Sequence, residues 1–210
     1  AAAAIALSRH KTAAEMVDAI SAAATLIGPA PRNHLAQGIL VRNVWPAAGA
    51  WSGMMAVEWG ECGIAGAPGA FFDVYGTVLG GEIHAARLTE RLGESWAILD
   101  GYTKIYACCQ HLHSAVEAAL DLRKSLGAQT LENVRAITVE THPLALPLVN
   151  PKPHTTLSAK FSMSHAMAAA LAMGSGGADA FAATTLDDPA LARLRERVSV
   201  KPWAEALPPP

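Results

Sequence analysis

Charged residues are scarce in this sequence, and their scarcity limits the partners that the chain can bind. Only 16% of the 210 residues are charged, and the net charge at pH 7 is -2. Nucleic-acid-binding proteins usually present a strongly basic face, whereas the short basic run at residues 193–197 is interrupted by Glu196. We therefore expect no nucleic-acid partner.

Long hydrophobic runs are missing as well. No apolar stretch reaches the roughly 18 residues that a membrane-spanning helix needs without a charge or a helix breaker. The alanine-rich opening is not arranged as a signal peptide, because Arg9, His10 and Lys11 follow its apolar part instead of preceding it. The sequence therefore predicts a soluble, cytoplasmic protein with no membrane partner.

Cysteines are also few, and their positions exclude a disulfide framework. Cys108 and Cys109 are neighbours, and Cys62 is the third. Adjacent cysteines bridge each other only with strain, so three cysteines in this arrangement are expected to be reduced thiols, as in the cytosol.

The first part of the chain has the pattern of helices. Residues 1–27 are rich in Ala, Ile and Leu, and a second helix is expected at about 49–60. The large apolar side chains of this second helix recur at helical spacing and are expected to face the core: Trp51, Met54, Met55 and Trp59. Residues 63–81 are glycine-rich and are expected to form a loop. With a boundary at Gly80-Gly81, we predict that residues 1–81 are the C-terminal part of an all-helical domain.

The second part mixes helix and strand. Apolar spacing predicts helices over 111–126 and about 158–173, and alternating β-branched residues predict a strand over 134–141. Asp188 as the N-cap and Pro189 at the first helical position open a short helix that leads into a second strand. We therefore expect residues 82–210 to form an α/β, lid-like domain with a small sheet, and the whole chain to have an α+β fold.

Residues 104–113, KIYACCQHLH, concentrate reactive residue types. Metal binding is not favoured, because His111 and His113 are two apart and there is no pair of cysteines at CxxC spacing. The missing CxxC also argues against a redox site. An acid/base site fits better, since a lysine before a helix N-terminus favours an anion and histidine exchanges protons near neutral pH. The alternative left open is that both histidines simply pack at the start of the helix.

The extended stretch KIYACCQHLHSAVEAALDL resembles the lysine–tyrosine–cysteine–histidine signature of the MmgE/PrpD family. That family includes 2-methylcitrate dehydratase, cis-aconitate decarboxylase and iminodisuccinate epimerase. Three other stretches are similar to the family in order and in type, and with the signature they span about residues 38–200: VRNVWPAAGAWSGMMAVEWGECGIAG, LGESWAILDGYTKIYACC and PKPHTTLSAKFSMSHAMAAALAMG.

The resemblance implies a helical domain and an α/β domain with the active site between them, no cofactor, no metal, and a homodimer. It assigns catalytic roles to Lys104, His111 and His113. It also implies a substrate-binding group, in which Arg42 stands where the family has a lysine and His165 where tyrosine is frequent: Arg42, Tyr106, Lys160, Ser162 and His165.

Several features depart from the family pattern. Trp45-Pro46-Ala47 stands where many members have His-Pro-Gly, and Cys109 stands where decarboxylase members are expected to have histidine. The chain has no initiator methionine and stops at three prolines, so we expect a fragment of a longer protein whose second domain is incomplete.

The resemblance predicts a lyase that dehydrates, or decarboxylates, a small di- or tricarboxylate such as 2-methylcitrate. Fixed cations would stabilise the charge that develops on the substrate carboxylate when a neighbouring proton leaves, and histidine would move that proton. The alternatives are an epimerase of a dicarboxylate such as iminodisuccinate, and a non-catalytic truncated member of the family.

Overall fold

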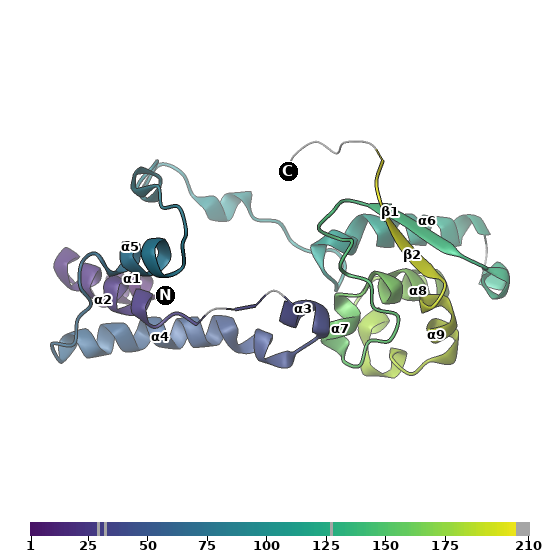
Figure 1. The fold of residues 1–210 in the computed structure, drawn as a ribbon, viewed down its shortest axis with the longest axis horizontal. Coiled ribbons are helices and arrows are strands. Elements are labelled where there is room, and N and C mark those ends of the chain that lie inside the picture. The colour runs from purple at the N-terminus through teal and green to yellow at the C-terminus, as the bar shows by residue number, and fades with distance from the viewer. Residues whose placement is uncertain (29, 32, 127, 205–210) are drawn as a thin grey trace. The chain divides into compact units, whose positions relative to one another are not determined.

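The computed structural model describes residues 1–28, 30–31, 33–126 and 128–204 (Figure 1). Contacts divide the chain into two units, one of Ala1–Ala30 with Val41–Gly101 and the other of Pro31–Leu40 with Tyr102–Pro210. We call them unit 1 and unit 2. The division predicted at residues 1–81 and 82–210 concerns sequence domains and stays a prediction.

Helices dominate the described residues, with one two-stranded parallel sheet, which confirms the predicted α+β class. Among these residues no helix is both long and apolar enough to cross a bilayer.

Unit 1 contains helices packed around a small core of alanines and Val57. Its elements are α1 (Ala2–Ser8), α2 (Ala13–Thr25), α4 (Trp45–Glu61), α5 (Ala70–Phe72), a π-helical segment Asp73–Val78, and 3-10 turns at Ala85–Leu88 and Ala97–Asp100; a further 3-10 turn, η1 (Leu40–Val44), begins in unit 2 and ends in unit 1. The expectation that 63–81 is all loop was wrong, since α5 and the π-helical segment lie within it.

The helical pattern predicted for residues 1–27 is confirmed, but it forms two helices, α1 and α2. His10 has a left-handed φ of 56°, and Thr12 starts a new helix through a capping box: the Glu15 backbone N–H donates to Thr12 Oγ1 at 3.3 Å, and the Thr12 N–H donates to Glu15 Oε2 at 2.8 Å. This reciprocal pair satisfies two N–H groups that a helix start otherwise leaves free.

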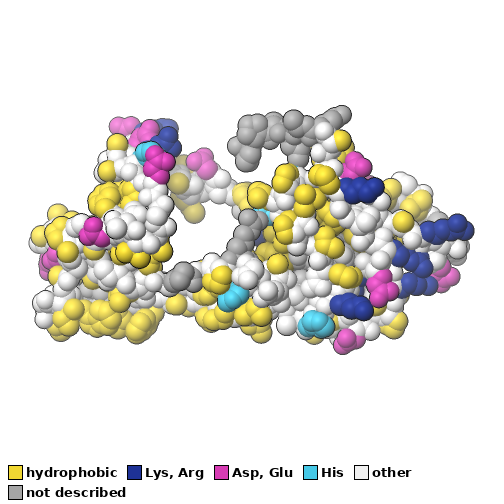
Figure 2. All heavy atoms as spheres, viewed as in Figure 1, with side chains coloured by type: hydrophobic (Ala, Val, Ile, Leu, Met, Phe, Trp, Pro, Cys, Tyr) yellow, Lys and Arg dark blue, Asp and Glu magenta, His cyan; other side chains and the backbone are white. Residues whose placement is uncertain are grey.

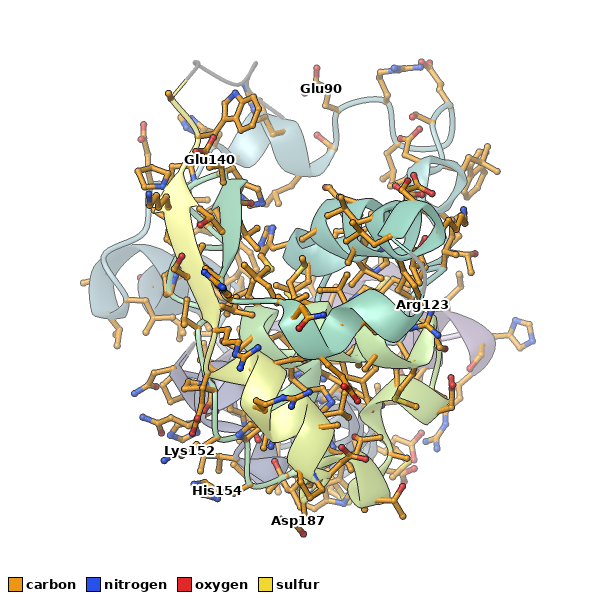
Figure 3. The ribbon with its side chains drawn as sticks, turned by 90° about the vertical axis from the view of Figure 1, so that its right-hand side faces the viewer. Glu90, Arg123, Glu140, Lys152, His154 and Asp187 are labelled. Carbon is orange, nitrogen blue, oxygen red and sulfur yellow. The ribbon has the colours of Figure 1, made fainter. Side chains whose placement is uncertain are left out.

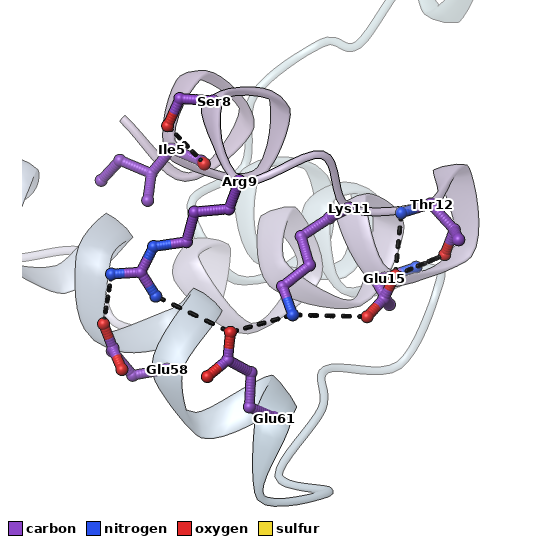
Figure 4. Close-up of polar contacts among 8 residues, drawn as sticks. All are labelled: Ile5, Ser8, Arg9, Lys11, Thr12, Glu15, Glu58 and Glu61. Atoms are coloured by element: carbon purple, nitrogen blue, oxygen red, sulfur yellow. Dashed lines mark hydrogen bonds and ion pairs between the residues drawn. The ribbon is translucent and has the colours of Figure 1, made fainter.

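Ion pairs hold the turn between α1 and α2 against α4 (Figure 4). Arg9 pairs with Glu58 at 2.5 Å, and Lys11 bridges Glu61 at 2.9 Å and Glu15 at 3.4 Å. Because these side chains are partly exposed, water screens the pairs and each contributes little to stability. They fix the direction of the turn more than they stabilise the unit.

The side chains that α4 buries are the small ones. Gly53, Ala56 and Val57 face inward, whereas Trp51 and Met54 are exposed by 56% and 37%. Figure 2 shows hydrophobic side chains at the surface along this helix. The predicted core role of the large apolar stripe was therefore wrong for Trp51 and Met54. A Cβ at Gly53 would lie 2.7 Å from Ala1 and Ala2 atoms, so close packing with α1 selects the small face.

Unit 2 is built around α8, which is buried from Met163 to Leu171. Two parallel strands pair beside it, with Ile137 opposite Val198. The elements are α3 (Asn33–Gln37), η5 (Gln110–Leu112), α6 (His113–Leu126), η6 (Ala128–Asn133), β1 (Ile137–Thr141), α7 (Thr156–Lys160), α8 (Met163–Met173), 3-10 turns at Asp179–Phe181 and Ala183–Thr185, α9 (Pro189–Arg195) and β2 (Val198–Pro202).

Local signals explain where these elements begin and end. Asp188 accepts a hydrogen bond from the Leu191 N–H at 2.9 Å, which confirms it as the N-cap of α9. Gly174 ends α8 with a φ of 72°, a conformation that favours glycine. Arg123 of α6, labelled in Figure 3, donates to the carbonyl oxygens of Leu171 and Ala172 and so satisfies the free end of α8.

Candidate functional site

The segment before α6 is fixed to the rest of unit 2 by backbone hydrogen bonds. The Ala107 N–H donates to Gly176 O at 2.9 Å, and the Cys109 N–H donates to Lys160 O at 2.8 Å. Lys104 is exposed, and its Nζ reaches Cys108 O at 3.5 Å. The cluster at residues 104–113 is therefore anchored through its backbone, with the Lys104 ammonium group at the surface.

The two predicted catalytic histidines belong to different pairs. His111 lies in η5, and its ring packs edge to face on His142, with ring centroids 4.9 Å apart. His113 is the first residue of α6, and its ring packs on Tyr106 at 5.2 Å. His113 Nε2 is buried, with no hydrogen-bond partner among the described residues. The structure therefore pairs the His111 ring with His142 and the His113 ring with Tyr106.

A pocket of about 620 Å³ opens beside His111 within unit 2. Of residues 104–113, only Cys109 and His111 are among the described residues that line it. Its walls come from α3, from the turn that follows β1 and from the residue after α7: Asn33, Leu35, Ala36, Cys109, His111, Pro143, Leu144, Pro147, Leu148 and Phe161. A preformed pocket with mostly apolar walls and a few polar groups is typical of small-molecule sites.

Lys160 and Ser162 flank Phe161, and the hydrogen bonds described for both residues involve backbone groups. Lys160 ends α7 and accepts the Cys109 N–H through its carbonyl oxygen. Ser162 is completely buried; its Oγ accepts from the His165 N–H at 3.0 Å and donates to Asn150 O at 2.5 Å. The predicted substrate-binding roles of both residues stay predictions.

His165 is also completely buried, and its partners lie in the core of unit 2. Arg195 donates to its Nδ1 at 3.2 Å, so the proton of a neutral ring resides on Nε2, which donates to Ala180 O at 2.9 Å. Burial lowers the pKa of His165; the hydrogen bond to Ala180 opposes this shift, and the charge of Arg195 adds to it. His165 does not line the pocket beside His111.

Arg42 lies in η1 and belongs to unit 1, whereas the pocket lies in unit 2. Its predicted contact with substrate stays a prediction. Tyr106 is partly buried next to His113, and burial raises the pKa of its phenol. Its hydroxyl therefore remains a neutral group that can donate a hydrogen bond at pH 7.

Burial also controls the thiol of Cys108. It raises the pKa of Cys108 to about 12, with Cys109 adding to the shift and Lys104 opposing it. Because the thiolate is the reactive form, Cys108 acts as a small apolar core residue. The three cysteines are free thiols, and the described part of the chain contains no group of three His, Cys, Asp or Glu side chains that could hold a metal ion.

His142 and the pocket walls were not identified from the sequence. His142 directly follows β1, at the carboxyl end of a parallel strand, and this edge of a sheet is a frequent place for binding residues. That rule could have identified His142 from the sequence. No sequence pattern could have identified the contribution of α3 to the pocket, because it depends on a contact between residues far apart in the sequence.

Comparison with known protein families gives a match that lies within unit 2. Residues 106–206 match the family model of the MmgE/PrpD C-terminal domain. The match contains His111, His113, Lys160, Ser162 and His165, and it begins after Lys104 and Arg42. No curated protein matches the chain.

Proposed function

Because residues 106–206 match the C-terminal domain of the MmgE/PrpD family, we propose that the chain is a cofactor-independent lyase acting on a small carboxylate. The proposed reaction is the dehydration of a di- or tricarboxylate such as 2-methylcitrate. The observation that carries the proposal is the position of His111, a group able to transfer protons, on the wall of the preformed pocket of unit 2.

The chemistry needs one proton to leave and one to arrive. A base removes the proton from the carbon next to a carboxylate, the electron pair of that bond forms the carbon–carbon double bond, and the hydroxyl on the neighbouring carbon leaves with a proton as water. His111 is proposed to transfer a proton in this step, which typically contributes about 10²–10⁴-fold. His142 contacts the His111 ring and would hold its orientation.

Lys104 is proposed to stabilise the charge that builds up on the substrate carboxylate. Its ammonium group is exposed and lies 3.5 Å from the carbonyl of Cys108, one residue from the pocket wall at Cys109. His113, whose buried Nε2 has no hydrogen-bond partner among the described residues and whose ring contacts Tyr106, would support the N-terminus of α6. A cytoplasmic homodimer completes the proposal.

The decisive test follows 2-methylcitrate, cis-aconitate and iminodisuccinate by proton NMR with the full chain and with His111→Gln. Dehydration of 2-methylcitrate that falls at least about 100-fold in the variant would support the proposal. His154→Gln is the control, because His154 is exposed and lies outside the pocket (Figure 3); it should retain full activity.

Two outcomes would count against the lyase. Solvent deuterium exchange at the substrate carbon without net dehydration would indicate an epimerase. Binding of these carboxylates without any turnover would indicate the non-catalytic alternative.

A further inference from the structure

The described residues in the walls of the pocket carry no formal charge. Seven of its ten lining residues are apolar, and among the described residues that line it there is no lysine, arginine, aspartate or glutamate. The polar groups are the Asn33 amide, the Cys109 thiol and the His111 imidazole. A ligand carboxylate placed deep in such a pocket would lose its water without gaining a cation from the described lining residues, which is strongly unfavourable.

The pocket also has room for more of a ligand than the part that its three polar groups could contact. Its volume of about 620 Å³ is in the range of sites that hold ligands with many non-hydrogen atoms. Hydrocarbon is the chemistry that gains most from apolar walls, because each buried methylene contributes about 0.8 kcal/mol.

Contacts behind the walls keep this space open. Thr155 Oγ1 donates to Gly38 O at 3.2 Å and so ties the segment carrying α3 to α7. Gly38 has a φ of 70°, and a Cβ there would lie 2.5 Å from the Ser158 side chain, so this approach requires glycine. On the opposite wall, the Met163 N–H donates to Leu148 O at 2.7 Å.

We propose that the pocket binds the hydrocarbon substituent of a carboxylate ligand, with the acid group outside at the mouth. The natural substrate is then a di- or tricarboxylate of the proposed class that carries an alkyl substituent longer than the methyl group of 2-methylcitrate. The inference rests on the proposed lyase activity for its reaction, but it concerns binding and is tested separately from turnover.

The test is a calorimetric titration of the full chain with straight-chain monocarboxylates from acetate to octanoate at pH 7. Affinity should rise about fourfold with each added methylene until the pocket is full. Equal affinity along the series would overturn the proposal.

Two matched variants locate the binding. Leu144 lines the pocket and is 47% exposed, whereas Leu122 lies on α6 outside it and is 50% exposed. Leu144→Trp fills the space and should abolish the gain with chain length, and Leu122→Trp should preserve it. If Leu144→Trp keeps the gain, the hydrocarbon binds elsewhere and the proposal fails.

The outcomes separate this inference from the lyase activity. Affinity that rises with chain length, without turnover of any carboxylate, would retain the pocket assignment and reject the lyase. Turnover of 2-methylcitrate with equal affinity along the series would reject the pocket assignment and retain the lyase.

Discussion

His165 and Arg195 place two potential cations side by side in the core of unit 2. Arg195 is 4% exposed and also donates to the backbone oxygens of Thr185 and Leu186. No carboxylate pairs with this arginine among the described residues. A charged His165 would therefore be buried against a like charge, and the core requires the neutral ring.

This arrangement predicts how stability depends on pH. Burial holds the pKa of His165 below its ordinary value, which is about 6.5, so the unfolded chain binds a proton at a higher pH than the folded chain does. The free energy of unfolding should be highest above pH about 6.5 and should fall as the pH is lowered through the folded pKa. Urea titrations from pH 8 to pH 5 measure this slope.

The variant His165→Gln should lose that part of the pH dependence, while His154→Gln should keep it. His154 is exposed and serves as the matched histidine. Identical slopes in the wild type and His165→Gln would show that His165 titrates alike in both states.

The sequence shows where titratable and capping side chains occur, but it does not show what surrounds them in the fold. Asp188 and Pro189 predicted the start of α9 correctly, because an N-cap acts only on its own first turn. Such local reasoning could not place His165 in the core, because its partners Ala180 and Arg195 are distant in the sequence and meet it only in the folded structure.

Helix boundaries depend on similarly local contacts, and they divided some predicted elements. The helix expected over about 158–173 is two helices, α7 and α8, because Phe161 leaves the helical path and Ser162 caps a new start. The pattern Thr12-x-x-Glu15 was a readable signal for the break between α1 and α2. The helix predicted over 111–126 and the strand predicted over 134–141 form over most of their length, at 113–126 and 137–141, because strong periodicity dominates there.

The cap at Ser162 gives a second prediction. Removing its hydroxyl leaves the His165 N–H and the Asn150 carbonyl without this partner inside the core. Ser162→Ala should therefore lower the free energy of unfolding by about 1–3 kcal/mol in urea titrations. Ser125→Ala, near the exposed end of α6, should change it by less than about 0.5 kcal/mol. Unchanged stability in Ser162→Ala with a raised KM would instead favour the predicted role in substrate binding.

The described residues form two separate hydrophobic cores, and we therefore expect the chain to unfold in two steps. Val57 belongs to the core of unit 1 and Val116 to that of unit 2, with 3% and 0% exposure. Differential scanning calorimetry should resolve two transitions. Val57→Ala should lower the midpoint of one and Val116→Ala that of the other, because truncating a buried valine costs about 1.5–3 kcal/mol in the unit that contains it. A single transition that both substitutions shift equally would contradict this independence.

The path of the chain has a practical consequence for anyone who trims this protein. Residues 106–206 carry the family match, yet one wall of the pocket is formed by Asn33, Leu35 and Ala36, which precede that match and join unit 2 through Gly38 and Thr155. An expression clone cut to residues 106–206 would therefore have its pocket open on one side. The family match covers part of unit 2, and the walls of the pocket include a segment that lies outside this match.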